Sequence, residues 1–198
     1  ILEPEHISAY SLKIEAGTKF YDLYEEGKLN LPEEEIDRKM YHYTIDLLSQ
    51  YGIYQYEISN FAKKGFECKH NLIYWYNEEY LGLGISAHSY INSIRYANSC
   101  TFNDYLTLLR NNNLPIITKE PKNRNDKIIE TMFLGLRMNK GINIQRFKEK
   151  FGVTPFEIYG EKLKNLADSG LTNINKKSIC LTKYGMDVSN QVFIEFLL

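Results

Sequence analysis

The chain has 198 residues, of which 43% are hydrophobic and 25% are charged, and its formal net charge is −1. This composition is typical of a folded globular protein and excludes a disordered or fibrous chain. The near-neutral charge excludes a general electrostatic attraction to nucleic acid or to anionic membranes.

The first residues lack the features of a secretory signal. Residues 1–5, Ile-Leu-Glu-Pro-Glu, contain neither a basic start nor an apolar stretch. No run approaches the roughly 18 apolar residues of a transmembrane helix. We therefore expect a cytoplasmic protein without a transmembrane segment. A first residue other than Met, followed closely by a strand-like segment, also predicts that the sequence begins inside a larger domain.

The first half of the chain has the pattern of a parallel α/β unit. Residues 6–14 mix β-branched, aromatic and small residues, as in a strand covered on both faces. A helix is expected after Pro32, ending at Gly52, because apolar residues repeat at helical spacing: Ile36, Met40, Tyr43, Leu47 and Tyr51. Residues 54–59 form the next expected strand, so strand, helix and strand predict a parallel sheet.

Residues 80–85 are expected to form a third, buried strand. Gly82 and Gly84 in this segment would let a neighbouring backbone or a ligand come close. Farther along, Thr101 and Asp104 have the spacing of a capping box, which predicts a helix that starts at this point.

A polar stretch at residues 121–125 predicts a boundary between two domains, residues 1–120 and 121–198. Beyond it, helices are expected around residues 129–136 and 144–151, and from Thr154-Pro155 to Gly170. A hairpin is expected over residues 171–182. Three helices and a hairpin resemble a winged helix.

The chain has three cysteines, Cys68, Cys100 and Cys180. Their odd number and wide spacing predict reduced thiols and not a disulfide framework. They also lack the close spacing of a cluster-binding motif.

The segment 68–75, Cys-Lys-His-Asn-Leu-Ile-Tyr-Trp, carries the clearest candidate for ligand chemistry. The imidazole of His70 could serve as an axial ligand of haem iron, and nearby aromatic rings could cover the apolar face of a porphyrin. By its chemistry alone, a single histidine beside Tyr and Trp is more often a hydrogen-bonded structural residue. Chemistry alone therefore leaves both interpretations open.

Residues 70–75 and 79–90 together resemble the signature of HemW-type radical S-adenosylmethionine proteins, which were long grouped with oxygen-independent coproporphyrinogen III oxidases. Segments 9–18 and 56–62 resemble the same family, and the C-terminal stretch from residues 132–137 to the closing residues 192–196 resembles its small C-terminal domain. The resemblance therefore covers nearly the whole chain. It implies an α/β fold: the C-terminal portion of a partial (β/α) TIM-like radical SAM barrel in residues 1–120, followed by a small winged-helix-like α+β domain.

The resemblance also implies cofactors. Haem would bind through His70, with Asn71, Tyr74 and Trp75 shaping its pocket. S-adenosylmethionine would lie at the C-terminal ends of barrel strands, near Ala9, Tyr10, Ser11, Phe61, Gly84, Ile85 and Ser86. The family's Cys-x-x-x-Cys-x-x-Cys motif, which holds a [4Fe-4S] cluster, does not occur in these 198 residues. We therefore expect this chain to be catalytically inactive by itself.

Three classes of function fit these patterns. The leading hypothesis is a haem chaperone that delivers haem to acceptor proteins. The enzyme alternative is an oxygen-independent coproporphyrinogen III oxidase, which carries out an oxidative decarboxylation in porphyrin biosynthesis. The third is a winged-helix module that binds nucleic acid through Lys176 and Lys177 at the hairpin tip. The near-neutral charge favours a solvated turn there, so no nucleic-acid partner is expected.

Overall fold

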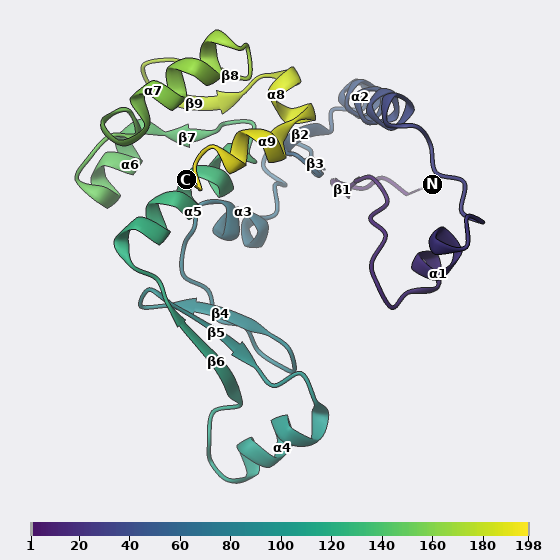
Figure 1. Cartoon of the computed structure of the whole chain (residues 1–198), viewed down its shortest axis with the longest axis vertical. Coiled ribbons are helices and arrows are strands. Elements are labelled where there is room, and N and C mark those ends of the chain that lie inside the picture. The colour runs from purple at the N-terminus through teal and green to yellow at the C-terminus, as the bar shows by residue number, and fades with distance from the viewer. Residues whose placement is uncertain (1, 198) are drawn as a thin grey trace. The chain divides into compact units, whose positions relative to one another are not determined.

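The computed structural model describes residues 2–197, and the chain divides into two compact units at residues 68 and 69. The first unit contains β1 (His6–Ser8), α1 (Lys19–Glu25), α2 (Glu34–Gln50), β2 (Tyr54–Glu57) and β3 (Asn60–Ala62) (Figure 1). The second unit begins with α3 (Lys69–Trp75) and extends to the C-terminus.

The first unit is built on an antiparallel sheet, so the predicted parallel pairing is wrong. The strand order is β1-β3-β2, and β3 runs antiparallel to both neighbours. The chain turns back after Glu57, whose fully buried carboxylate accepts hydrogen bonds from the Ser59 backbone N at 3.2 Å and from the Asn60 side chain. This tight hairpin inserts β3 between β1 and β2. The strand expected over residues 6–14 ends at Ser8.

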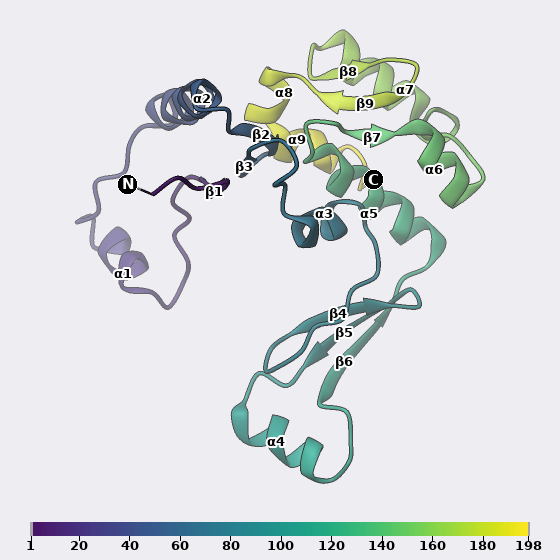
Figure 2. The same ribbon diagram turned by 180° about the vertical axis from the view of Figure 1, so that it is seen from behind.

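The helix predicted after Pro32 is confirmed as α2, and the chain leaves it through Gly52 at a φ of 72°. Figure 2 shows helices α1 and α2 from behind. Neither helix has a buried residue. The apolar side chains that predicted α2 are therefore partly or largely exposed, among them Ile36, Met40 and Tyr43.

A second antiparallel sheet follows α3 in the chain. It contains β4 (His88–Ile91), β5 (Ile94–Asn98) and β6 (Ile116–Pro121), in that order. Helix α4 (Phe102–Arg110) connects β5 to β6 and lies at the end of this sheet that is remote from α5 (Figure 1). The predicted cap is confirmed, because Thr101 Oγ1 accepts from the Asp104 backbone N at 3.4 Å.

The strand predicted at residues 80–85 is wrong. Tyr80 forms an isolated bridge with Tyr90, while Leu81 and Leu83 are 65% and 83% exposed. Gly84 has a φ of 105°, which breaks an extended strand. The close approach expected at the glycines does occur at Gly82, where a Cβ atom would lie 2.0 Å from the His88 carbonyl oxygen. The sheets of residues 2–197 are antiparallel, so the predicted barrel strands are not seen in the described part of the chain.

The C-terminal elements confirm the predicted helices and hairpin. They are α5 (Arg124–Leu136), β7 (Ile142–Asn143), α6 (Ile144–Phe151), α7 (Pro155–Asp168), β8 (Thr172–Ile174), β9 (Ser178–Leu181), α8 (Lys183–Asp187) and α9 (Ser189–Ile194). The sheet order is β7-β9-β8. Side chains from these helices and strands form one apolar core that includes Met132, Leu136, Phe147, Leu163, Ile179, Val192 and Phe196. Within residues 2–197, no helix is both long and apolar enough to cross a membrane.

Helices α5 and α6 hold the C-terminal end of α3. Lys150 Nζ on α6 donates to the carbonyl oxygen of Asn77 at 2.7 Å, and the Asn77 side chain donates to Thr131 Oγ1 on α5 at 3.2 Å. Arg146 forms an ion pair with Glu78. Burial lowers the pKa of Lys150, so the protein removes part of the water from around its ammonium group.

Substitution Gly141→Ala should destabilise the second unit by about 3 kcal/mol. Gly141 has a φ of 63°, and a Cβ atom there would lie 2.0 Å from the carbonyl oxygen of Ile179 in β9. Urea unfolding would measure the change. Gly152→Ala is the matched control: its φ is 74°, but a Cβ atom there would meet nothing within 4 Å. The control should cost about 1 kcal/mol, and equal costs would contradict the steric explanation.

Substitution Lys150→Met should loosen the end of α3 without unfolding the core. It removes the hydrogen bond to Asn77, whose own backbone N–H bonds to the carbonyl oxygen of Tyr74. Hydrogen exchange at the amides of Asn77 and Glu78 should accelerate about fivefold. Lys148→Met on the same helix is the control. If both variants exchange like the unsubstituted protein, Lys150 does not hold this end.

Candidate functional site

Helix α3 carries the predicted haem motif, and its side chains separate onto two faces. His70 and Tyr74 are four residues apart and project from nearly the same direction, because successive residues turn by about 100° in a helix. Trp75 lies about 140° around the helix from His70 by the same geometry. The four predicted motif residues therefore spread over an arc of about 140° around α3.

His70 is exposed, and its Nε2 lies 2.8 Å from the Tyr74 hydroxyl oxygen. The two rings meet edge to face, with their centroids 4.9 Å apart. Among the contacts of residues 2–197, the hydrogen bond to Tyr74 engages one ring nitrogen of His70, and Nδ1 has no described partner. The imidazole can therefore offer a lone pair to a ligand from the surface.

The Tyr74 ring also packs against Tyr80. Their centroids are 4.5 Å apart, again edge to face. Burial raises the pKa of the Tyr80 hydroxyl above its usual value. His70, Tyr74 and Tyr80 thus form a short row of rings, in which Tyr80 was not among the predicted site residues.

Trp75 packs on the other face of α3. The guanidinium of Arg137 from α5 lies 4.6 Å from the centroid of its ring. Its indole nitrogen is buried and has no hydrogen-bond partner among the described residues. Asn71, one turn earlier, is partly buried. Residues 71 and 75 project from nearly the same direction, away from that of His70.

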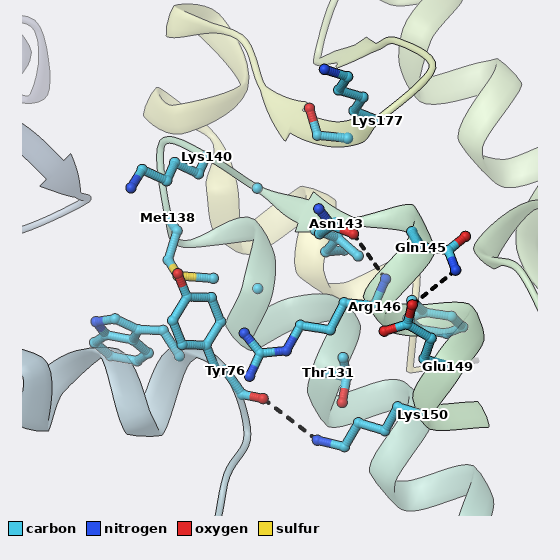
Figure 3. A pocket seen from close by; sticks show the side chains of 16 residues that line it. Tyr76, Thr131, Met138, Lys140, Asn143, Gln145, Arg146, Glu149, Lys150 and Lys177 are labelled. Atoms are coloured by element: carbon cyan, nitrogen blue, oxygen red, sulfur yellow. Dashed lines mark hydrogen bonds between the residues drawn. The ribbon is translucent and has the colours of Figure 1, made fainter.

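A cavity of about 590 Å³ opens beside this second face (Figure 3). Its walls come from α3, α5, β7, α6 and the β8–β9 hairpin. The lining includes Trp75 and four basic side chains, Lys140, Arg146, Lys150 and Lys177, together with the carboxylate of Glu149. Sequence reasoning missed this cavity because its residues are spread from position 75 to position 178. The spacing of Arg146 and Lys150, one turn apart, was the local signal available.

Three of the residues predicted to contact S-adenosylmethionine lie together in the first unit. Ala9, Tyr10 and Ser11 line a cavity of about 300 Å³ with Asp37 and other residues of that unit. The Ser11 hydroxyl donates to Asp37 Oδ2 at 2.8 Å, and hydrogen bonding from Arg38 lowers the pKa of that carboxyl. The lining of this cavity thus combines small and polar groups, such as Ala9, Ser11 and Asp37, with larger apolar and aromatic side chains.

Phe61 lies in β3 of the same unit and is fully buried, paired in register with Ile7. Gly84, Ile85 and Ser86 belong to the second unit. There the Gly84 carbonyl accepts from Asn98 Nδ2 at 2.9 Å, and the Ser86 backbone N donates to the Ser99 carbonyl oxygen at 2.9 Å. These bonds fix a loop beside β5. Of the predicted set, the structure thus brings Ala9, Tyr10 and Ser11 to one cavity.

The cysteines do not suit an iron-sulfur cluster. Cys68, Cys100 and Cys180 are free thiols, the first two in loops and the third in β9, and burial raises the pKa of the Cys180 thiol. Within residues 2–197, no group of three His, Cys, Asp or Glu side chains is placed to hold a metal ion. The residues of this chain therefore do not fit a [4Fe-4S] cluster, which needs closely spaced thiolates.

Comparison with known proteins gives consistent results. Residues 123–188 match the family described as HemN C-terminal domain. The chain is 41% identical to "Heme chaperone HemW" of Bacillus subtilis (strain 168), over 99% of this chain and 52% of the relative. It is 38% identical to "Heme chaperone HemW" of Lactococcus lactis subsp. lactis (strain IL1403), over 100% of this chain and 52% of the relative.

A solved structure shares the fold. It is described as "Coproporphyrinogen III oxidase (HemN) from Escherichia coli is a Radical SAM enzyme", with a TM-score of 0.73 and 18% identity over 98% of this chain and 48% of that one. This chain spans about half the length of the curated relatives named above. It belongs to the HemW/HemN-like radical SAM family and corresponds to roughly the C-terminal half of its members.

Proposed function

We propose that this protein binds haem through His70 and acts as a haem chaperone that passes haem to an acceptor protein. The observation that carries the proposal is the exposed imidazole on α3, with one ring nitrogen held by Tyr74 and the other without a described partner. The relatives named "Heme chaperone HemW" support the choice of cargo.

The hydrogen bond to Tyr74 suits an iron ligand. A histidine that binds a metal usually donates its second ring N–H to a fixed acceptor, which sets the tautomer and the ring orientation. If Nε2 carries the proton and donates to the Tyr74 oxygen, the lone pair of Nδ1 is available to haem iron. The exposed position of the ring also allows the cargo to leave, as transfer to an acceptor requires.

The other predicted sites form part of the same proposal. S-adenosylmethionine would bind near Ala9, Tyr10 and Ser11, where the cavity offers small side chains and the carboxylate of Asp37. Asn71, Tyr74 and Trp75 would shape the haem pocket beside His70. Residues 121–198 would form the second domain, which the match over residues 123–188 supports. The cysteines that hold a cluster would come from outside these 198 residues.

Substitution His70→Ala should abolish the haem complex seen as a Soret band and weaken haem binding by at least about tenfold, because the axial ligand is lost. Absorbance titration of the purified protein with haem measures both effects. His88→Ala is the control, since His88 is also exposed and bonds through Nδ1 to the Ser86 carbonyl oxygen. An unchanged spectrum and affinity in His70→Ala would refute the proposal.

Substitution Tyr74→Phe should weaken haem binding by about tenfold while the Soret band persists, because the ring remains but the hydrogen bond to His70 is lost. The same titration measures this. Tyr80→Phe provides the comparison, since it also removes a hydroxyl from the row of rings but not the one bonded to His70. Equal losses in the two variants would mean that Tyr74 does not orient the imidazole.

A further inference from the structure

The β4–β6 sheet and α4 form an arm of the second unit, residues 79–122. Figure 1 shows the sheet extending away from α5, with α4 at its far end. Among the described residues, the side chains that form or flank the apolar core of this unit lie within residues 128–196, so the arm contributes none of them. The arm therefore depends on other contacts for its position.

The chain passes between the arm and the rest of the unit at two points. At the first, Glu78 pairs with Arg146 of α6, whereas the Glu79 carboxylate accepts from a backbone N of the β4–β5 turn at 2.6 Å. At the second, the backbone N of Lys122 donates to the β4–β5 turn at 2.7 Å, whereas Asn123 caps α5. Neighbouring residues are thus held by different bodies at both points, which is the geometry of a hinge.

A nearly buried carboxylate on α5 reaches the arm beside this hinge. The two oxygens of Glu130 accept from the two terminal nitrogens of the Arg95 guanidinium in β5, at 3.1 and 3.2 Å. The ammonium nitrogen of Lys122 lies 3.2 Å from the same carboxylate, and the side chains of Glu130 and Lys122 are 10% and 11% exposed. We call these contacts the Glu130 bridge. Loss of one partner from such a desolvated pair is strongly unfavourable.

The rest of the joint between the arm and α5 is open. Three residues before Glu130, Lys127 donates to the Ser93 hydroxyl oxygen at 3.0 Å. Beside this bond lies a cavity of about 450 Å³, which is lined by Tyr90 and Ser93 of the arm and by Lys127 of α5, among other residues. Space at the joint leaves room for the arm to rotate.

The base of the arm also contacts α3. Tyr80 and Tyr90 exchange backbone hydrogen bonds of 2.9 Å in both directions, so Tyr80 moves with β4. The Tyr80 ring packs on the ring of Tyr74, with their centroids 4.5 Å apart, and the Tyr74 hydroxyl oxygen lies 2.8 Å from His70 Nε2. Two successive side-chain contacts therefore connect the arm to the imidazole.

We infer that the arm is a hinged element that the Glu130 bridge holds in the observed position, and that this position sets the orientation of the His70 ring through Tyr80 and Tyr74. Loss of the bridge lets the arm rotate about residues 78–79 and 122–123. The rotation separates Tyr80 from Tyr74 and frees the imidazole to turn. The inference concerns the protein without a ligand, so it does not depend on haem binding.

Two spin labels measure the position of the arm in the 198-residue chain. One label is attached to Cys100, an exposed thiol between β5 and α4, and the other to a Lys164→Cys substitution on the exposed side of α7. Cys68→Ser and Cys180→Ser remove the remaining thiols. Double electron–electron resonance should give one narrow distance. Glu130→Gln should raise the ratio of a displaced position to the observed one by at least about tenfold.

Glu120→Gln is the matched control. It removes the same charge and also takes a partner from Lys122, at 2.6 Å, but Glu120 belongs to the arm and is 64% exposed. It should leave the label distance unchanged. Arg95→Gln breaks the bridge from the arm and leaves α5 unaltered, so it tests the inference even where Glu130→Gln fails to fold. It should displace the arm in the same direction, while slow hydrogen exchange in α7 reports that the core is folded.

The orientation of His70 is followed in the same variants by ¹H–¹³C NMR of its Cε1–H group, with the signal assigned from His70→Ala. The signal should move in Glu130→Gln and Arg95→Gln, and it should stay in place in Glu120→Gln. An unchanged label distance in both bridge variants, an equal change in Glu120→Gln, or an unmoved His70 signal beside a displaced arm would each overturn the inference. Haem titration tests the proposed function separately, so the two failures are distinguishable.

Discussion

The candidate sites depend on the bonds that attach the C-terminal end of α3 to α5 and α6. Helix α3 has seven residues, a length at which a helix is unstable in isolation. Its position is set by the bond from Lys150 to the Asn77 carbonyl, by the bond from Asn77 to Thr131, and by Arg137 stacked on Trp75. These contacts fix where His70 points and where one wall of the cavity stands.

The short helix α3 therefore contributes side chains to two different surfaces. The turn of about 100° per residue places His70 and Tyr74 toward Tyr80, and Trp75 toward Arg137 and the cavity. Three residues that are close in sequence therefore project in different directions. His70 and Tyr74 lie on one side of α3, and Trp75 lies on another. On this arrangement, Trp75 packs against Arg137 and the cavity, on a different side of α3 from the exposed ring of His70.

The basic side chains around the end of α3 have different roles. Arg146 and Lys150 use their donors within the protein, on Glu78 and on backbone carbonyl oxygens, and so contribute to the folded arrangement. Lys140 and Lys177 border the same cavity without such partners in the described residues. Glu130, nearly buried, pairs with Arg95 and Lys122 and joins the β4–β6 sheet to α5. These ion pairs and hydrogen bonds therefore connect neighbouring helices and strands of the second unit.

The sequence by itself determined the local features. Helix α2, the Thr101 cap, the helices after residue 121 and the β8–β9 hairpin follow from periodicity, capping residues and turn residues that act over a few positions. The family resemblance also followed from short segments, because it rests on the order of the residues within them. Only the tertiary structure decided how strands pair. Strand β3 lies between β1 and β2, which were expected to pair with each other in parallel, and residues 80–85 do not form a strand. It likewise decided which residues meet at the cavity, because Trp75, Lys140 and Lys177 come together through packing of helices and strands far apart in sequence, which no local pattern encodes.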